Sequence, residues 1–402
     1  MVKVAVFGYG TVGSGVVEVL EQNKDIITKK AGDVLEVKYV LDLRDFPGDP
    51  IQEKVVHDVN VILEDPEIQI ICETMGGNEP AYTFTKKALL SGKSVCTSNK
   101  ELVANHGPEL LQIAKENNCN YLFEASVGGG IPIIRPLNYC LTAEKIDAIT
   151  GILNGTTNYI LTKMDREGAS FEDVLKQAQD LGYAERNPEA DVEGYDACRK
   201  IAILSSLMSG KNVNFANIYT EGITKITSTD FAYAKAMGKS IKLLAMSKEV
   251  GDGYCAMVSP CMISREHPLY MVNDVFNAVF VHSNMLGDSM YYGKGAGKLP
   301  TASAVVGDVI DCARSLGTTL KCFWDAEDAK LVSKDEMARK FFVRVSADAK
   351  AKVDEVFGAV EVLKVEGLDS EFGFVTEVMT EKVFEEKLAS VEGVITRIRI
   401  EE

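Results

Sequence analysis

The stretch Val2-Lys-Val-Ala-Val-Phe-Gly-Tyr-Gly-Thr-Val-Gly13 opens the chain and decides its fold class. An apolar strand runs into a glycine-rich turn, and a helix-compatible segment follows. In the pattern G-x-G-x-x-G, the first glycine permits a tight turn, the second lets the backbone approach a pyrophosphate, and the third lets the helix pack closely on the strand. We therefore predict a dinucleotide-binding turn formed by five residues: Gly8, Gly10, Thr11, Val12 and Gly13.

The rest of the first 125 residues continues this alternation of strand and helix. Apolar runs that predict further strands lie at 35–41, 68–72, 93–97 and 120–125. Segments that predict helices lie between them, at 13–22, 79–91 and 107–116. Such alternation is typical of a parallel sheet with helices on both faces. The expected fold class is α/β, with an N-terminal Rossmann domain built on a doubly wound parallel sheet.

After residue 130 the segments lengthen, which predicts an α+β domain. Strands are expected at 145–154, 240–247, 253–262 and 275–283, and helices at 192–209, at 300–316 and after the capping residue Ser170. The region after residue 337 alternates strand and helix again. Its order predicts a small α+β module at the C-terminus.

Size and charge exclude several classes of partner. A chain of 402 residues predicts two or three domains. Its 43 Lys+Arg against 59 Asp+Glu give a formal net charge of −16. Because this field repels phosphate backbones and anionic lipid surfaces, we expect no nucleic acid and no membrane as partner.

The nine cysteines lack CxxC spacing and predict reduced, buried thiols in a cytoplasmic protein. None of the four histidines is spaced like a metal-ligand pair.

Asp42 follows the second predicted strand, where this fold places the acidic residue that reads the ribose. Asp42 favours a free 2′-hydroxyl and therefore NAD. Arg44 could instead pair with the 2′-phosphate of NADP. The connection from Gly13 is longer than usual because residues 23–33 extend it. The residues leave both cofactors, NADP or NAD, open.

Two polar stretches follow later strands, at the sheet edge where ligands of doubly wound folds bind. In Thr97-Ser98-Asn99-Lys100, the lysine could orient a substrate carbonyl or carboxylate, or be a plain surface charge. The stretch EASVGGGIP (124–132) sets glycine-rich backbone beside the Glu124 carboxylate. Its carbonyl oxygens could bind a hard cation, and a domain hinge is the alternative.

The stretch LGYAERNPEADVEGYDACRK (181–200) carries the candidate proton-transfer group. Asp196 and Lys200 are four residues apart, so they share one face of a predicted helix. A solvated surface pair has the same spacing. If that face borders a cleft, however, a lysine held by a carboxylate can donate and accept a proton. Glu185, in the preceding loop, could meet an ammonium or a hydroxyl group. Proton transfer beside a nicotinamide is the minimum requirement of an alcohol–carbonyl oxidoreductase.

Six stretches, in order, resemble the homoserine dehydrogenase family and cover residues 1 to about 315. They are GYGTVGSGV (8–16), TSNK (97–100), EASVGGGIPIIRPL (124–137), GILNGTTNYIL (151–161), LGYAERNPEADVEGYDACRKIAIL (181–204) and GKGAGKLPTASAVVGDV (293–309). The resemblance implies reversible, NAD(P)-dependent interconversion of L-aspartate 4-semialdehyde and L-homoserine, a step toward threonine and methionine. A homodimer or homotetramer is expected.

The resemblance also implies roles for single residues. Lys200 would be the proton donor in reduction, Asp196 would support it, and Lys100 would line the same site. Glu185 and Asp191 would bind the substrate. The residues implied at the cofactor, besides the glycine turn and Asp42 or Arg44, are Thr97, Ser98, Lys100, Gly182 and Gly297. The ligands implied for a monovalent cation, Na⁺ or K⁺, are Glu124 and the backbone oxygens of Val127, Gly129 and Ile131.

The family pattern suggests how the domains divide. We expect an NAD(P)-binding domain over 1–130, closed by a helix over 298–316, and a substrate-binding and dimerisation domain over 131–297. A linker over 317–337 and a regulatory or assembly domain over 338–402 follow. The last domain resembles an ACT module, but its turn SADAKAKV (346–353) lacks the glycine that such modules use to approach an amino acid. One strand also looks abbreviated around 361–364. These departures argue against threonine inhibition and favour an assembly role.

Two other classes remain open. A non-catalytic dinucleotide sensor would keep the glycine turn but would not need Glu185, Asp196 and Lys200. An aspartate-semialdehyde dehydrogenase would need an activated thiolate. Cys198 lies between Asp196 and Lys200, but on a helix and not at a nucleophile elbow.

Overall fold

The computed structural model describes residues 1–402 and divides into two compact units. The first comprises 1–145, 202–215 and 291–329, and the second comprises 146–201, 216–290 and 330–402. The glycine turn therefore lies in the first unit, and the Asp196–Lys200 pair lies in the second. None of the helices combines the length and the apolar character needed to cross a lipid bilayer.

The first unit is built on a six-stranded parallel sheet with the order β3-β2-β1-β4-β5-β6. Its strands are β1 (Val2–Phe7), β2 (Leu35–Leu41), β3 (Val55–Val56), β4 (Ile68–Glu73), β5 (Ser94–Thr97) and β6 (Tyr121–Leu122). The chain runs outward to both sides from β1, so the order reverses between β1 and β4. Ligands of open α/β sheets bind at this reversal, beyond the carboxyl ends of the strands. The predicted doubly wound fold is confirmed.

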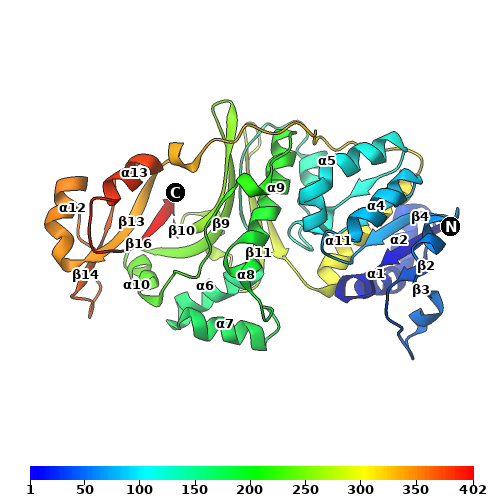
Figure 1. The fold of residues 1–402 in the computed structure, drawn as a ribbon, viewed down its shortest axis with the longest axis horizontal. Coiled ribbons are helices and arrows are strands. Elements are labelled where there is room, and N and C mark those ends of the chain that lie inside the picture. The colour runs from blue at the N-terminus through cyan, green and yellow to red at the C-terminus, as the bar shows by residue number, and fades with distance from the viewer. The chain divides into compact units, whose positions relative to one another are not determined.

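Helices cover both faces of this sheet (Figure 1). They are α1 (Thr11–Gln22), α2 (Lys24–Ala31), α3 (Asn60–Leu63), α4 (Ala81–Leu90), α5 (Lys100–Glu116) and α11 (Lys298–Arg314). Helices α1 and α11 share a buried core with β1 through Val6, Val16 and Val305. Helix α5 begins earlier than the expected 107–116, because the Asn99 side chain accepts a hydrogen bond from the Leu102 N–H at 3.1 Å and caps it.

The strand expected over 120–125 is wrong in its second half. Strand β6 ends at Leu122, and residues 124–126 form a 3₁₀ turn. The cause is the Glu124 carboxylate, which accepts hydrogen bonds from the backbone N–H groups of Ile133, Ile134 and Arg135 at 2.6, 2.9 and 2.7 Å. These bonds fold the glycine-rich loop back onto Glu124, so the chain cannot continue as a strand.

A mixed sheet with the order β12-β11-β7-β9-β10-β16-β13-β14 organises the second unit. Its strands are β7 (Ile146–Ile152), β9 (Lys239–Val250), β10 (Gly253–Ser264), β11 (Phe276–Ser283), β12 (Gly287–Lys294), β13 (Ala338–Ser346), β14 (Glu371–Val375) and β16 (Val394–Glu401). Two short strands lie beside it: β8 (Tyr219–Thr220) pairs with β10, and β15 (Met379–Thr380) pairs with β13. Strand β16 pairs in parallel with β10, so the C-terminal module extends the sheet.

The helices of this unit include the two that carry the candidate site. They are α6 (Gly155–Glu167), α7 (Phe171–Asp180), α8 (Glu189–Val192), α9 (Tyr195–Ser209), α10 (Ser228–Ala236), α12 (Lys350–Phe357) and α13 (Glu381–Leu388). Ser170 caps α7 as predicted. The single helix expected over 192–209 is wrong at its start: Gly194 has a φ of +82°, which separates α8 from α9. Helix α6 and strand β12 were not predicted.

The C-terminal module packs α12 and α13 on its strands around Phe341, Phe374 and Phe384. The expected abbreviated strand is confirmed, since only Leu363 pairs, with Gly373. Residues 317–329 belong to the first unit, and residues 330–337 belong to the second. Trp324 is buried and packs edge-on against Phe123 in the first.

Candidate active site

The lysine–carboxylate pair of α9 is largely shielded from solvent. Lys200 Nζ donates hydrogen bonds to Asp196 Oδ2 and to the Leu153 carbonyl oxygen, both at 2.7 Å. The two side chains are only 11% and 9% exposed. A solvated surface pair would expose both charges, so Asp196 and Lys200 are not such a pair. An ammonium held by two oxygens in a protected place is suited to proton transfer.

Asn154 links this pair to a second carboxylate, and sequence reasoning missed it. Its side-chain nitrogen donates to Asp191 Oδ1 at 2.7 Å and to Asp196 Oδ2 at 2.9 Å. Its side-chain oxygen accepts from the Thr157 N–H at 2.8 Å and so caps α6. The signal was present in NGTTN, because asparagine is among the preferred residues at a helix N-terminus. The network therefore comprises Asn154, Asp191, Asp196 and Lys200.

Glu185 and Gly182 lie in the loop after α7, outside this network. Glu185 is exposed, and its backbone oxygen accepts a hydrogen bond from Gln179 Nε2 at 3.0 Å. Gly182 has a φ of +74°, and no heavy atom lies within 4 Å of a Cβ placed there. The loop thus has an open surface at both residues.

The glycine turn of the first unit has the geometry that a pyrophosphate needs. Gly8 has a φ of +87°, and a Cβ on Gly13 would lie 1.9 Å from the Gly8 oxygen. A Cβ on Gly10 would meet no heavy atom within 4 Å. No side chain caps α1, so the N–H groups of its first turn, from Thr11 and Val12 onward, can bind an anion. These residues fit a dinucleotide.

Asp42 and Arg44 meet at this turn. Asp42 Oδ2 accepts from the Tyr9 N–H at 2.8 Å, and Arg44 pairs with the same carboxylate at 2.9 Å. The hydrogen bonds from Arg44 hold the pKa of Asp42 well below its usual range. The Arg44 side chain is 62% exposed. Both candidate ribose readers are therefore in place at the end of β2.

Buried polar contacts join the carboxyl ends of β4 and β5. Thr97 Oγ1 donates to Glu73 Oε2 at 2.6 Å, and Asn99 Nδ2 donates to the Gly77 oxygen at 2.6 Å. Burial raises the pKa of Glu73, a residue that sequence reasoning missed although it ends an apolar strand. Ser98 follows β5 and is half-buried, and Lys100 is the first residue of α5.

The Glu124 loop was expected to bind a monovalent cation. Because the Glu124 carboxylate already accepts three backbone N–H groups, its side chain is committed to holding the loop. The positive φ angles of Gly128 and Gly129 turn the backbone sharply after Val127 and before Ile131. The backbone carbonyls of this loop are hard oxygen donors of the kind that bind a monovalent cation.

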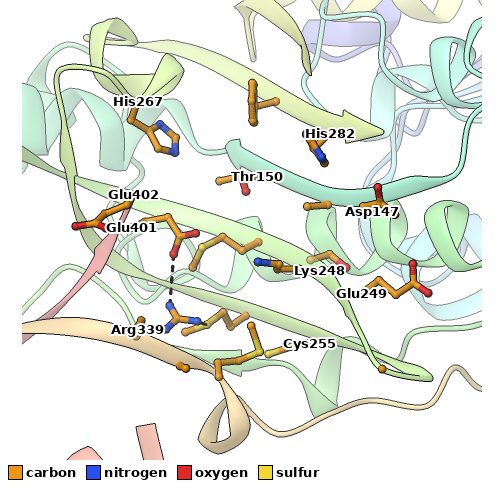
Figure 2. Close-up of a pocket in the computed structure, with 18 residues that line it drawn as sticks. Asp147, Thr150, Lys248, Glu249, Cys255, His267, His282, Arg339, Glu401 and Glu402 are labelled. Atoms are coloured by element: carbon orange, nitrogen blue, oxygen red, sulfur yellow. Dashed lines mark hydrogen bonds and ion pairs between the residues drawn. The ribbon is translucent and has the colours of Figure 1, made fainter. Parts of the chain in front are cut away.

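A cavity of about 570 Å³ lies elsewhere, on the sheet of the second unit (Figure 2). Strands β7, β9, β10 and β11 line it together with the C-terminal strands, and Arg339 faces Glu401 across its floor. None of the four network residues lines it. The cavity is therefore distinct from the candidate active site.

Comparisons with known proteins identify the family of this chain. A family model described as homoserine dehydrogenase matches residues 132–310, and one described as its NAD-binding domain matches 8–124. The Bacillus subtilis homoserine dehydrogenase is 40% identical over 351 residues, which are 86% of this chain and 81% of that protein.

Solved structures extend the likeness to the whole chain. A homoserine dehydrogenase from Thiobacillus denitrificans has a TM-score of 0.93 and 34% identity, with 100% of this chain and 98% of that chain covered. A hyperthermophilic archaeal homoserine dehydrogenase, solved in complex with NADPH, has a TM-score of 0.65 and 29% identity over 77% of this chain and 97% of its own.

These matches decide between the three classes that the sequence left open. A non-catalytic sensor is excluded, because the relative that matches this chain is an enzyme, and the family model that matches residues 132–310, which include the Asp196–Lys200 pair, is that of the same enzyme. Burial raises the pKa of the Cys198 thiol, the opposite of what a nucleophilic thiolate needs. The chain belongs to the homoserine dehydrogenase family and is an NAD(P)-binding oxidoreductase that acts on a CH–OH group of a small molecule.

Proposed function

We propose that this protein interconverts L-homoserine and L-aspartate 4-semialdehyde with NAD(P), on the route to threonine and methionine, and that Lys200 moves the proton. The observation that carries the proposal is the Lys200 side chain, which is only 11% exposed and whose ammonium is held by Asp196 and Leu153. An ordinary surface lysine would be neither buried nor held by two oxygens.

The hydrogen bonds of the Lys200 ammonium support this role in proton transfer. Lys200 has three N–H bonds, and two are used by Asp196 and Leu153. The third is assigned to the substrate oxygen, which takes the proton during reduction and returns it during oxidation. The bound nicotinamide supplies or accepts the hydride at its C4 atom. Asp196 stabilises the positive charge of Lys200 and keeps its side chain in one orientation.

Asn154 is proposed to keep the two carboxylates in place. Its amide nitrogen carries two hydrogens, and one goes to Asp191 and the other to Asp196. Glu185, exposed in the loop before α8, is proposed to bind the substrate with Asp191. Lys100, at the carboxyl end of β5, is a second proposed substrate contact.

The cofactor is proposed to be NADP or NAD, bound at the glycine turn with Thr97, Ser98, Lys100, Gly182 and Gly297. The archaeal relative solved with NADPH supports a phosphorylated cofactor. The exposed Arg44 supports it as well, because its guanidinium could leave Asp42 for a 2′-phosphate. A sodium or potassium ion is proposed at the backbone oxygens of Val127, Gly129 and Ile131, beside Glu124.

The chain is proposed to comprise an NAD(P)-binding domain over 1–130, which α11 closes, and a substrate-binding and dimerisation domain over 131–297. A linker over 317–337 and a regulatory or assembly domain over 338–402 are proposed to follow. The exposed Met290 and Tyr292 of β12 support a homodimer or homotetramer formed by the second domain. Seven buried, unbridged cysteines support the cytoplasm, where thiols stay reduced.

One assay tests the reaction. Purified protein is mixed with L-homoserine and NAD or NADP, with and without sodium or potassium, and reduced nicotinamide is followed by absorbance. Turnover is expected, and the faster cofactor shows whether Asp42 or Arg44 reads the ribose. No turnover with either cofactor, despite tight dinucleotide binding, would refute the proposed substrate. Stimulation by one cation is the result expected from the Glu124 loop.

A further inference from the structure

We infer that Glu221 is a positioning residue for the Asp196–Lys200 pair and that Arg399 of the C-terminal strand β16 holds Glu221 in place. The inference rests on the proposed function of Lys200. It gives the C-terminal module a part in the active site besides any role in assembly.

A charged cluster in the second unit joins Glu221 to β16. Glu221 Oε2 accepts from Arg399 Nη1 at 2.6 Å, from Tyr219 Oη at 3.0 Å and from Arg397 Nη1 at 3.3 Å. Arg399 is almost wholly buried and also donates to Glu381 Oε2 at 3.0 Å. Although burial opposes ionisation, the two arginines lower the pKa of Glu221. A buried pair of this kind is costly to break because the remaining charge stays uncompensated.

The backbone around Glu221 is equally constrained. The Glu221 N–H donates to the Val258 oxygen at 2.9 Å, and the neighbouring β8 pairs with β10. Arg399 also lies over the ring of Tyr219, with 5.0 Å from its Cζ to the ring centre. Glu221 is therefore tied to the sheet by its backbone and to the C-terminal module by its side chain.

The residues after Glu221 pack directly on the turn that precedes α9. The Ile223 N–H donates to the Val192 oxygen at 2.8 Å, and Thr224 Oγ1 donates to Glu193 Oε1 at 3.0 Å. A Cβ on Gly222 would lie 2.3 Å from the Val192 oxygen, so the two backbones approach as closely as only glycine allows.

Gly194, at the end of that turn, completes the contact. A Cβ placed on Gly194 would lie 3.1 Å from Thr220 Cγ2 and 3.2 Å from Val258 Cγ1. The Gly194 N–H donates to the Asp191 oxygen at 3.0 Å, and the Gly194 oxygen accepts from the Cys198 N–H at 2.9 Å. The turn thus sets where α8 ends and where α9 begins.

Asp191 and Asp196 lie on either side of this turn, and Asn154 bonds to both. A displacement of the turn would change the separation of the two carboxylates, so Asn154 could no longer serve both. Lys200, held by Asp196 one helical turn later, would move with it. Misplacement of a reacting group by about 1 Å can lower a rate by about 100-fold. Glu221 and Arg399 therefore act through position and not through contact with the substrate.

The test compares Glu221→Gln and Arg399→Lys with the matched control Arg344→Lys. Arg344 is also a buried arginine of the C-terminal module, and it pairs with Asp230 of α10 at 2.6 Å. Its hydrogen bonds and ion pairs go to Thr227, Asp230 and Glu371 and not to the turn before α9, so it reports the cost of weakening the module alone. Thermal unfolding checks that each variant is folded, and Glu221→Gln keeps the shape of a half-buried side chain.

Two readouts decide the inference. Hydrogen exchange of peptides covering 189–198 should rise in Glu221→Gln and Arg399→Lys and stay unchanged in Arg344→Lys. The kcat for L-homoserine should fall about 10- to 100-fold in the first two variants, with the KM for NAD(P) unchanged. Equal exchange and equal kcat in all three variants would overturn the inference. If wild-type protein showed no turnover, the proposed function would fail, and the exchange readout would still decide whether Glu221 positions the turn.

Discussion

Asn154 donates from its side-chain nitrogen to Asp196 at 2.9 Å, although 42 residues separate them. The same side chain caps α6 through its oxygen, which accepts from the Thr157 N–H. One residue therefore sets both the start of a helix and the orientation of the carboxylate that holds Lys200. Because the two tasks use different atoms, they can be separated by substitution.

Asn154→Ser is predicted to lower kcat without destabilising the protein. Serine is as good a helix cap as asparagine, but it cannot donate to Asp191 and Asp196 together. We expect kcat to fall by on the order of 10- to 100-fold and the unfolding temperature to stay nearly the same. Asn154→Ala should lose activity similarly and also cost about 1 kcal/mol of stability. Full activity in Asn154→Ser would show that the bridge is dispensable.

Lys200→Met is predicted to lower turnover by about 10²- to 10⁴-fold, because it removes the proposed proton donor. The Kd for the dinucleotide, measured by fluorescence titration, should stay the same, since the glycine turn belongs to the other unit. Lys163→Met is the matched control: Lys163 forms an i,i+4 pair with Glu167, but that pair is exposed. If turnover fell and the dinucleotide Kd rose together in Lys200→Met, the lysine would be structural.

Gly10→Ala is predicted to lose dinucleotide binding, whereas Gly13→Ala is predicted to lose stability. A Cβ on Gly10 meets no heavy atom within 4 Å, so the variant should fold normally and obstruct the bound pyrophosphate. A Cβ on Gly13 would lie 1.9 Å from the Gly8 oxygen, so that variant should lose stability. Dinucleotide titration and thermal unfolding of each variant measure the two effects. Undiminished binding by Gly10→Ala would remove this turn from the cofactor site.

The free energy of unfolding is predicted to rise with pH because Lys242 is buried in the folded protein. Lys242 is 1% exposed, and its ammonium donates to the Val272 oxygen at 2.7 Å and to Asn273 Oδ1 at 2.9 Å. Burial lowers the pKa of Lys242 to about 8. Below pH 8 the folded protein carries the full cost of this buried charge. Between there and the pKa of an unfolded lysine, near 10.4, the unfolded chain binds more protons, so stability increases.

The expected gain amounts to about 3 kcal/mol across that window. Urea unfolding of wild type and Lys242→Met at several pH values measures it, because alkaline effects on other residues cancel in the difference. The unfolding free energy of wild type should rise relative to that of Lys242→Met as the pH rises from about 8. A difference that stays constant with pH would mean that Lys242 does not titrate in this range.

The sequence by itself determined the features whose parts are close along the chain. The dinucleotide turn could be predicted because a strand, its glycines and the following helix are contiguous over residues 2–22. The Asp196–Lys200 pair could be predicted because helical geometry places residues four apart on one face. The doubly wound sheet followed from the alternation of strands and helices, and the family resemblance followed from six motifs in order.

Only the tertiary structure decided which of these groups act together. Lys200 donates to the backbone oxygen of Leu153, and its partner Asp196 accepts from Asn154; each bond joins residues more than 40 positions apart. The break at Gly194 and the insertion of β16 beside β10 also arise from packing between distant segments. Local patterns cannot encode such contacts, because each requires two surfaces that meet only when the chain has folded.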